Sequence, residues 1–109
     1  MSRENDAKIS RWSGLARISL LTDRIDMASV AFYTTRDSDA VCLLPVLVKK
    51  DFFPLLEHKY DDRWHLELWE RIEVSPKHYE SGLAFSGAGA TIHEAISEAV
   101  LKIIRECAE

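Results

Sequence analysis

The residues in this sequence best suited to bind a metal ion or transfer a proton are its four histidines. They are His58, His65, His78 and His93. No two of them stand four positions apart, the spacing that places two imidazoles on one helix face, and no HExxH motif occurs. The spacing therefore predicts scattered surface imidazoles, with no metal site and no cofactor.

One row of side chains has the composition of an acid–base site. His65 and Glu67 lie two residues apart, so both point to one face of a strand, and Trp69 follows on the same side. The same row suits the solvent-facing side of an antiparallel sheet, which is the commoner arrangement. No GxSxG motif places a nucleophile. We therefore expect no enzymatic activity.

A run of small residues from Ser86 to Thr91 lies between a predicted strand and a predicted helix, where phosphate-binding loops occur. The run completes neither phosphate-loop motif, because residue 92 is Ile and the next lysine is Lys102. We interpret it as a turn that leads into the helix. A seat for an anion or nucleotide is the less favoured alternative.

Cysteine usage and the N-terminus indicate the compartment. Cys42 and Cys107 lie far apart in apolar surroundings, which fits buried free thiols in a reducing environment. The first residues are polar and charged, unlike a secretory signal, and no apolar run is long enough to span a bilayer. We therefore expect a cytoplasmic protein without membrane contact.

The chain has 109 residues, with 18 acidic and 14 basic side chains and a net charge of −4. This length predicts one domain over residues 1–109. The basic residues are dispersed, so direct binding of nucleic acid is not expected. The acidic residues concentrate within 61–80 and 94–109, where they either attract a basic partner or keep the surface soluble.

The clearest predicted element is a C-terminal helix from residue 92 almost to the end. An apolar stripe with helical period supports it: Ile92, Ala95, Ile96, Ala99, Val100, Ile103, Ile104 and Cys107. Thr91 and Glu94 have the spacing of a capping box at its start. His93 and Glu94 are expected on the exposed face.

Two strands are predicted to form an antiparallel hairpin before this helix. Residues 64–74 alternate with a slip at 69–71, which predicts a bulge, and 75–78 have turn composition. Residues 79–85 return as the second strand, with Leu83 and Phe85 facing inward.

The middle of the chain is predicted to be helical. Asp37, Ser38 and Asp39 are N-cap candidates before the apolar run 40–48, which favours a helix kinked at Pro45 over a buried strand at 41–44. Residues 51–58 are expected to add a short helical turn.

The first third carries weaker signals. Ile9 and Trp12 suit an amphipathic helix that Gly14 interrupts, while 16–20 and 30–35 have strand composition. The elements together predict an α+β domain, a small layered fold in which an antiparallel hairpin or sheet packs against the amphipathic C-terminal helix and a second, mostly apolar helix. Residues 30–107 are expected to form the core.

Three segments carry a family resemblance. They are residues 33–40, residues 64–68 and residues 85–102, the last with a small-residue turn, Thr91 and the pattern Glu-Ala-Ile-x-x-Ala-x-x-Lys. Through them, residues 30–105 resemble the phage ABA sandwich family of small phage and prophage proteins. The sequence departs from the family at Pro45 and at Ser97-Glu98-Ala99, where Cys-Arg-Ala is usual. The resemblance implies a viral origin and a layered α+β fold, and it transfers no catalytic residue.

These observations favour a non-enzymatic accessory protein of a phage or prophage that binds a host protein or nucleoprotein complex, with inhibition of a host defence complex such as CRISPR machinery as its specific form. The predicted partner-binding residues are Asp61, Asp62, His65, Glu67, Trp69 and Arg71. Trp69 suits an interface hot spot or, equally, a core position. The alternatives are a self-associating structural domain, such as a homodimer, and a small anion- or nucleotide-binding protein.

Overall fold

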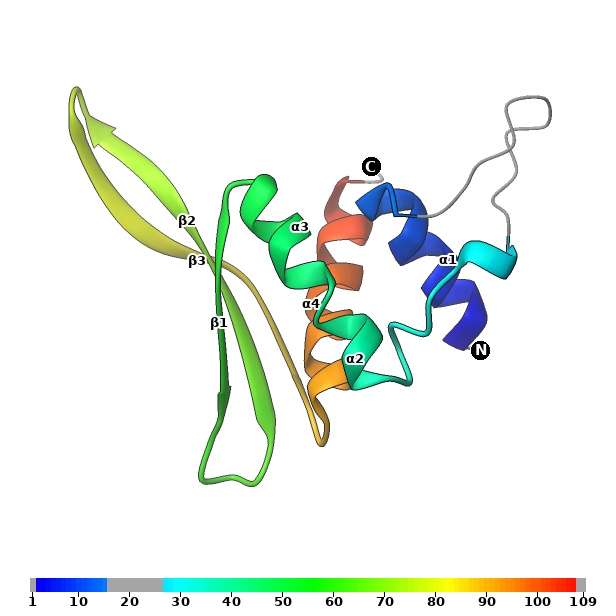
Figure 1. Ribbon diagram of the computed structural model, residues 1–109. Coiled ribbons are helices and arrows are strands. Elements are labelled where there is room, and N and C mark those ends of the chain that lie inside the picture. The colour runs from blue at the N-terminus through cyan, green and yellow to red at the C-terminus, as the bar shows by residue number, and fades with distance from the viewer. Residues whose placement is uncertain (1, 16–26, 108–109) are drawn as a thin grey trace, which may run out of the picture.

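The computed structural model describes residues 2–15 and 27–107. Its elements, in chain order, are α1 (Ser2–Ser13), the 3-10 helix η1 (Met27–Ser29), α2 (Asp37–Ala40), α3 (Leu43–Lys49), β1 (Phe52–His58), β2 (Trp64–Ser75), β3 (His78–Gly89) and α4 (Ile92–Cys107). The strands form one antiparallel sheet in the order β1-β2-β3, and the helices lie on one side of it (Figure 1). The predicted α+β class is therefore confirmed.

Helix α4 packs its apolar stripe against β2 and β3. Leu66, Leu68, Ile96 and Val100 are fully buried at this contact, and the core extends to Leu47 of α3. The capping box is confirmed, because Thr91 Oγ1 accepts the backbone N–H of Glu94 at 3.3 Å. The Glu94 carboxylate accepts the N–H of Ala90 at 3.0 Å, so the helix starts where the sequence predicts.

Two glycines let β3 run close to α4. A Cβ on Gly87 would lie 2.3 Å from the carbonyl oxygen of Ala95 and 2.6 Å from the amide nitrogen of Ala99. A Cβ on Gly89 would lie 2.4 Å from the Cβ of Glu94. The prediction of a turn from residue 86 was wrong, because β3 continues to Gly89 and these small residues serve strand–helix packing.

The hairpin of β2 and β3 is confirmed, with its turn at 76–77 and Lys77 at a φ of 66°. A register shift occurs beside Trp69, but not through the predicted slip in β2: Leu68 pairs with Phe85, and Trp69 pairs with Leu83. The extra residue therefore belongs to β3. Since one inserted residue reverses the alternation, Phe85 packs on the core while Leu83 faces away, which corrects its predicted inward position.

The apolar run 40–48 does not form the one kinked helix that was favoured, because Ala40 ends α2 and residues 43–48 belong to the separate helix α3. The break at 41–42 places Pro45 in the first turn of α3, where its missing N–H costs no helical hydrogen bond. No side chain caps α2, whose N-cap is Arg36. Cys42 lies at the break and is exposed, so the prediction of a buried thiol was wrong for this residue.

Residues 52–58 form strand β1, which corrects the predicted helical turn. Pro54 fits because β1 is an edge strand, where a residue without an N–H is tolerated. At the opposite edge, Lys102 of α4 donates a hydrogen bond from Nζ to the carbonyl oxygen of Ser86 at 2.7 Å. Each edge of the sheet therefore carries a feature that hinders the addition of another strand.

The N-terminal helix α1 joins the core through Ile9, and a polar network attaches residues 27–34 to it. The fully buried Asp6 accepts hydrogen bonds from the backbone N–H and the hydroxyl of Thr34, both at 2.9 Å, and from Arg3. Arg3 also donates to the carbonyls of Val30 and Ala31. These contacts hold 30–35 as a loop and turn, not the predicted strand.

Gly14, at a φ of 75°, follows the last residue of α1 and ends the helix there. The strand predicted at 16–20 lies outside the described residues. Among the residues that the structure describes, no helix has the length and apolar character needed to cross a bilayer.

Candidate protein-binding surface

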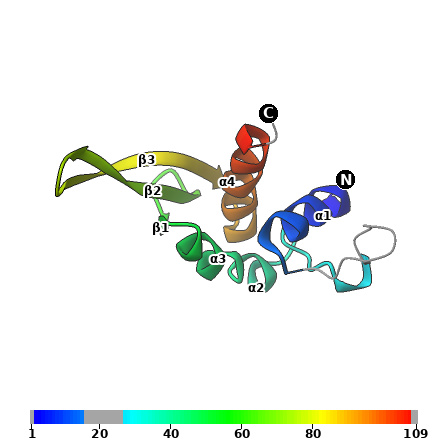
Figure 2. The ribbon, with the colours of Figure 1, turned by 90° about the horizontal axis from the view of Figure 1, so that it is seen from above.

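The side of the sheet that faces away from the helices is uncovered by the described residues (Figures 1 and 2). We call it the outer face. Along β2 it presents alternate residues, while Leu66 and Leu68 between them face the core. The outer-face residues of β2 are His65, Glu67, Trp69, Arg71 and Glu73. Four of the six predicted partner-binding residues therefore share this surface.

An apolar row crosses the middle of the outer face. Phe53 of β1 and Leu83 of β3 pair with Trp69 on either side, and these two flanking side chains are 56% and 51% exposed. Leu55, also exposed, adjoins the row beside Glu67. Trp69 is partly buried and lies outside the core cluster, so it belongs to the outer face. Contiguous exposed apolar residues of this kind mark interaction sites.

Asp61 and Asp62 occupy the turn between β1 and β2, at one end of the outer face. Asp61 accepts a hydrogen bond from the His65 ring at 2.9 Å, and Asp62 lies 3.2 Å from Nε2 of His58. The bond from His65 lowers the pKa of the Asp61 carboxyl, and the backbone N–H of Arg63 lowers it further. Both carboxyls are thus engaged with imidazoles of the same sheet.

At the other end, β2 and β3 continue beyond β1 as a two-stranded arm over residues 71–82. The last pair that β1 makes is between Phe52 and Glu70, and the arm projects past the helices (Figure 1). Arg71 lies on the arm with its guanidinium 3.8 Å from the ring centre of Tyr79. An isolated two-stranded ribbon is marginally stable in water. Its exposed faces are therefore surface that a partner can cover.

Phe53, Leu55 and Leu83 were missed by sequence reasoning. Residues 51–58 were assigned to a helical turn, which hides the alternation that places Phe53 and Leu55 on the outer face. Leu83 was assigned to the core, because the bulge beside it was expected in β2. The alternation of 53, 55 and 57 against 52, 54 and 56 was the available signal for the strand.

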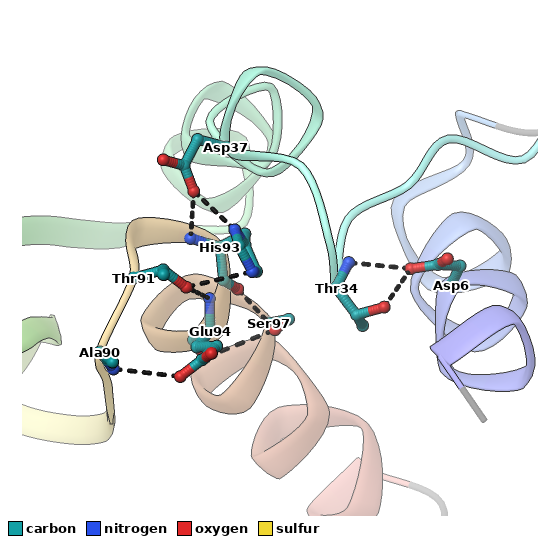
Figure 3. Close-up of polar contacts among 8 residues, drawn as sticks. All are labelled: Asp6, Thr34, Asp37, Ala90, Thr91, His93, Glu94 and Ser97. Carbon is teal, nitrogen blue, oxygen red and sulfur yellow. Dashed lines mark hydrogen bonds and ion pairs between the residues drawn. The ribbon is translucent and has the colours of Figure 1, made fainter.

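A second polar constellation links α2 to the start of α4 (Figure 3). Nδ1 of His93 lies 2.7 Å from Oδ1 of Asp37, and Nε2 of His93 lies 3.1 Å from Oγ1 of Thr91. Asp37 also accepts the backbone N–H of His93 at 3.0 Å. This backbone bond, followed by the bond from the ring, lowers the pKa of the Asp37 carboxyl. His93 is only 18% exposed, so its predicted surface position was wrong.

The order hydroxyl, imidazole, carboxylate is that of a hydrolytic triad, but the surroundings indicate a structural role. The Thr91 oxygen caps α4 by accepting the N–H of Glu94, and Asp37 supplies a second cap on the same helix end. The Ala90 N–H, a candidate donor to a substrate oxyanion, is already bonded to Glu94. The constellation therefore fastens α2 to α4.

A surface hollow of about 350 Å³ lies beside the sheet, where Phe52 and Phe53 of β1 meet Glu70 and Arg71 at the start of the arm. A hollow of about 160 Å³ lies at the β3 edge, where His65, Glu67 and Leu83 meet Lys102. A larger one, about 560 Å³, lies between α1 and α4 and is lined by Asn5, Lys8, Leu101, Ile104 and Arg105. Within residues 2–15 and 27–107, no group of three or more His, Cys, Asp or Glu side chains is arranged to hold a metal ion.

The described residues define a small α+β fold in which helices cover one face of the sheet and leave the other face open. Comparisons with protein-family models, with curated proteins and with solved structures gave no match to this chain.

Proposed function

We propose that this protein is a non-enzymatic binding module that engages another protein through its outer face. The observation that carries the proposal is the row of Phe53, Trp69 and Leu83 on an uncovered sheet face. Aromatic side chains next to charged ones have the composition of interface hot spots. The arm extends the same face and adds Tyr79 and Arg71 to it.

The chemistry of the rim favours a protein over a nucleic acid as the partner. On the outer face itself Glu57, Glu67 and Glu73 outnumber Arg71, so this face offers little attraction to a phosphate backbone. A host protein or nucleoprotein complex, bound by an accessory protein of a phage, is the partner that the family resemblance suggests. Inhibition of a host defence complex is the specific form of this proposal.

Affinity capture tests the proposal with a matched pair of variants. Trp69→Glu places a charge in the apolar row, whereas Val48→Glu places one at a 56% exposed apolar position on α3, away from the outer face. Tagged wild-type chain and both variants are incubated with lysate of a candidate host. A protein retained by wild type and by Val48→Glu, but lost with Trp69→Glu, supports the proposal. Equal capture by all three proteins would contradict it.

A second measurement separates the acidic turn from the apolar row. If Asp61 and Asp62 attract a basic partner, the double change to Lys should slow association at low salt and flatten its salt dependence. The dissociation rate should change less, because both residues lie at the exposed rim. An unchanged salt slope would remove long-range attraction from the recognition mechanism.

A further inference from the structure

We infer that the outer face fits a second copy of this chain, so that the protein forms a symmetric dimer with the two sheets packed face to face. This inference rests on the proposed function, because it names a second copy as an occupant of the same surface, for which a host protein would compete. It follows from the order of side chains along β2. The five outer-face positions of that strand are His65, Glu67, Trp69, Arg71 and Glu73.

When two copies of β2 face each other in opposite directions, this order of residues places side chains of opposite charge against each other. The two-fold axis lies midway between the two sheets, runs perpendicular to the strands and is level with Trp69. It reverses the order of the partner's β2 residues relative to those of the first copy. Trp69 then opposes Trp69 of the second copy, and Arg71 opposes Glu67. One row further out, Glu73 opposes His65. The axis relates each contact to an identical one, so the charged pair Arg71–Glu67 forms twice.

The neighbouring strands agree with this register. The Phe53–Trp69–Leu83 row lies on the axis, so the apolar side chains of both copies meet at the centre of the contact. The arm of each copy, which carries Tyr79, lies over the half of the partner's sheet that holds His65 and Ala88. Each arm thus gains the packing surface that it lacks in the single chain.

The charged side chains of the outer face, like its apolar row, are available to a partner. Among the described residues, neither Glu67 nor Arg71 has a side chain of opposite charge within ion-pair distance, and Arg71 rests on the Tyr79 ring. Opposite charges across an interface set its register and suppress other pairings. The cation–π contact holds the Arg71 side chain on the outer face, where it is available to Glu67 of a second copy.

The size of the surface predicts a weak dimer. Strand β1 ends beside Glu70, so only β2 and β3 span all five rows. Five rows at about 3.4 Å per residue and two strands about 4.8 Å apart give a footprint of roughly 34 by 10 Å, on the order of 330 Å² per copy, to which β1 adds Phe53 near the axis. The total of roughly 700 Å² lies below the range of standard specific interfaces. We therefore expect dissociation in the upper micromolar range, measurable by sedimentation from about 5 to 500 µM.

Charge reversal provides the test, because a two-fold contact makes a distinctive prediction. Arg71→Glu alone places two glutamates opposite each other at both pairs, and Glu67→Arg alone places two arginines there. Each variant should dimerise at least about tenfold more weakly than wild type. An equimolar mixture of the two variants restores an opposite charge at every pair, so it should form a heterodimer of near wild-type affinity.

The outcomes separate this inference from the proposed function. Loss of dimer in both variants and its recovery in the mixture supports the face-to-face register, and recovery also shows that both variants fold. Retention of the dimer in either variant, or no recovery on mixing, overturns it. A wild-type chain that stays monomeric to about 500 µM overturns it too. The proposed function would still stand in that case, provided that capture of another protein depends on Trp69.

Discussion

The contact between Asp37 and His93 should contribute measurably to stability, because one carboxylate caps α4 and also pairs with an imidazole of that helix. Asp37→Ala removes the bond to the His93 backbone N–H and the 2.7 Å bond to the ring. Loss of a cap costs about 1 kcal/mol, and an exposed ion pair adds up to about 1 kcal/mol. The free energy of unfolding should therefore fall by about 1 to 2 kcal/mol.

Urea denaturation followed by circular dichroism measures this loss, with Glu80→Ala as the control. Glu80 also pairs with a histidine, His78, at 3.7 Å, but its side chain is 65% exposed and caps no helix. We expect the control to lose about 0.5 kcal/mol or less. A loss for Asp37→Ala no greater than that of Glu80→Ala would refute the argument that the capping bond carries most of the effect.

The pH dependence supplies a second check on the same residue. The pKa of Asp37 is lowered in the folded protein, chiefly by the backbone N–H of His93 and then by its ring. Its stabilising contribution is therefore complete above the ordinary carboxyl pKa of about 3.9. The contribution is lost as the pH falls through the lower, folded-state value. The stability difference between wild type and Asp37→Ala should accordingly vanish in strong acid.

Three further substitutions test the packing. Gly87→Ala should destabilise the fold by about 1 to 3 kcal/mol in thermal unfolding, since its methyl group would meet α4 backbone at 2.3 Å, whereas Ala88→Gly should cost less. Asp6→Ala should cost about 3 kcal/mol in urea unfolding because it removes a buried acceptor of three hydrogen bonds. Thr91→Ala should cost about 1 kcal/mol, and unchanged stability would mean that the Thr91 cap contributes little.

The elements that local patterns specify were predictable. An uninterrupted apolar stripe and a capping box predict helix α4, and both were confirmed. The β2–β3 hairpin follows from alternation and from the turn at 75–78. In these segments the local propensity and the tertiary environment favour the same structure, so one sequence is sufficient to locate them.

The segments that were assigned wrongly are those whose secondary structure is determined by tertiary packing. Residues 52–58 hold two phenylalanines, a proline and two leucines. In such a short apolar run the hydrophobic periodicity does not distinguish a helix from a strand, and pairing with β2 makes these residues a strand. Residues 30–35 are rich in strand formers, yet the buried Asp6 and the Arg3 guanidinium bind their backbone and hold them as a loop. Such contacts span more than 25 positions and leave no local signal.

The candidate surface was predicted in part for a related reason. Its β2 residues follow from alternation, so His65, Glu67, Trp69 and Arg71 were located correctly on one face. The apolar row also needs Phe53 from a misassigned strand and Leu83 from beyond the bulge. Whether Trp69 was core or surface depended on which strand held the inserted residue, and only the pairing register answers that question.

The edges of the sheet determine whether association of this protein stops at a closed complex or continues into a polymer. A proline lies on β1 at one edge, and Lys102 occupies the Ser86 carbonyl at the other. Fibrous growth requires each new chain to add a strand to a free edge, so growth is hindered along β1 and along β3 beside Ser86. The two edges of the arm, beyond the end of β1, lack such protection. Contact through the outer face, in contrast, covers the surface that forms it and ends in a closed complex. Open-ended association of this protein would therefore have to begin at the arm.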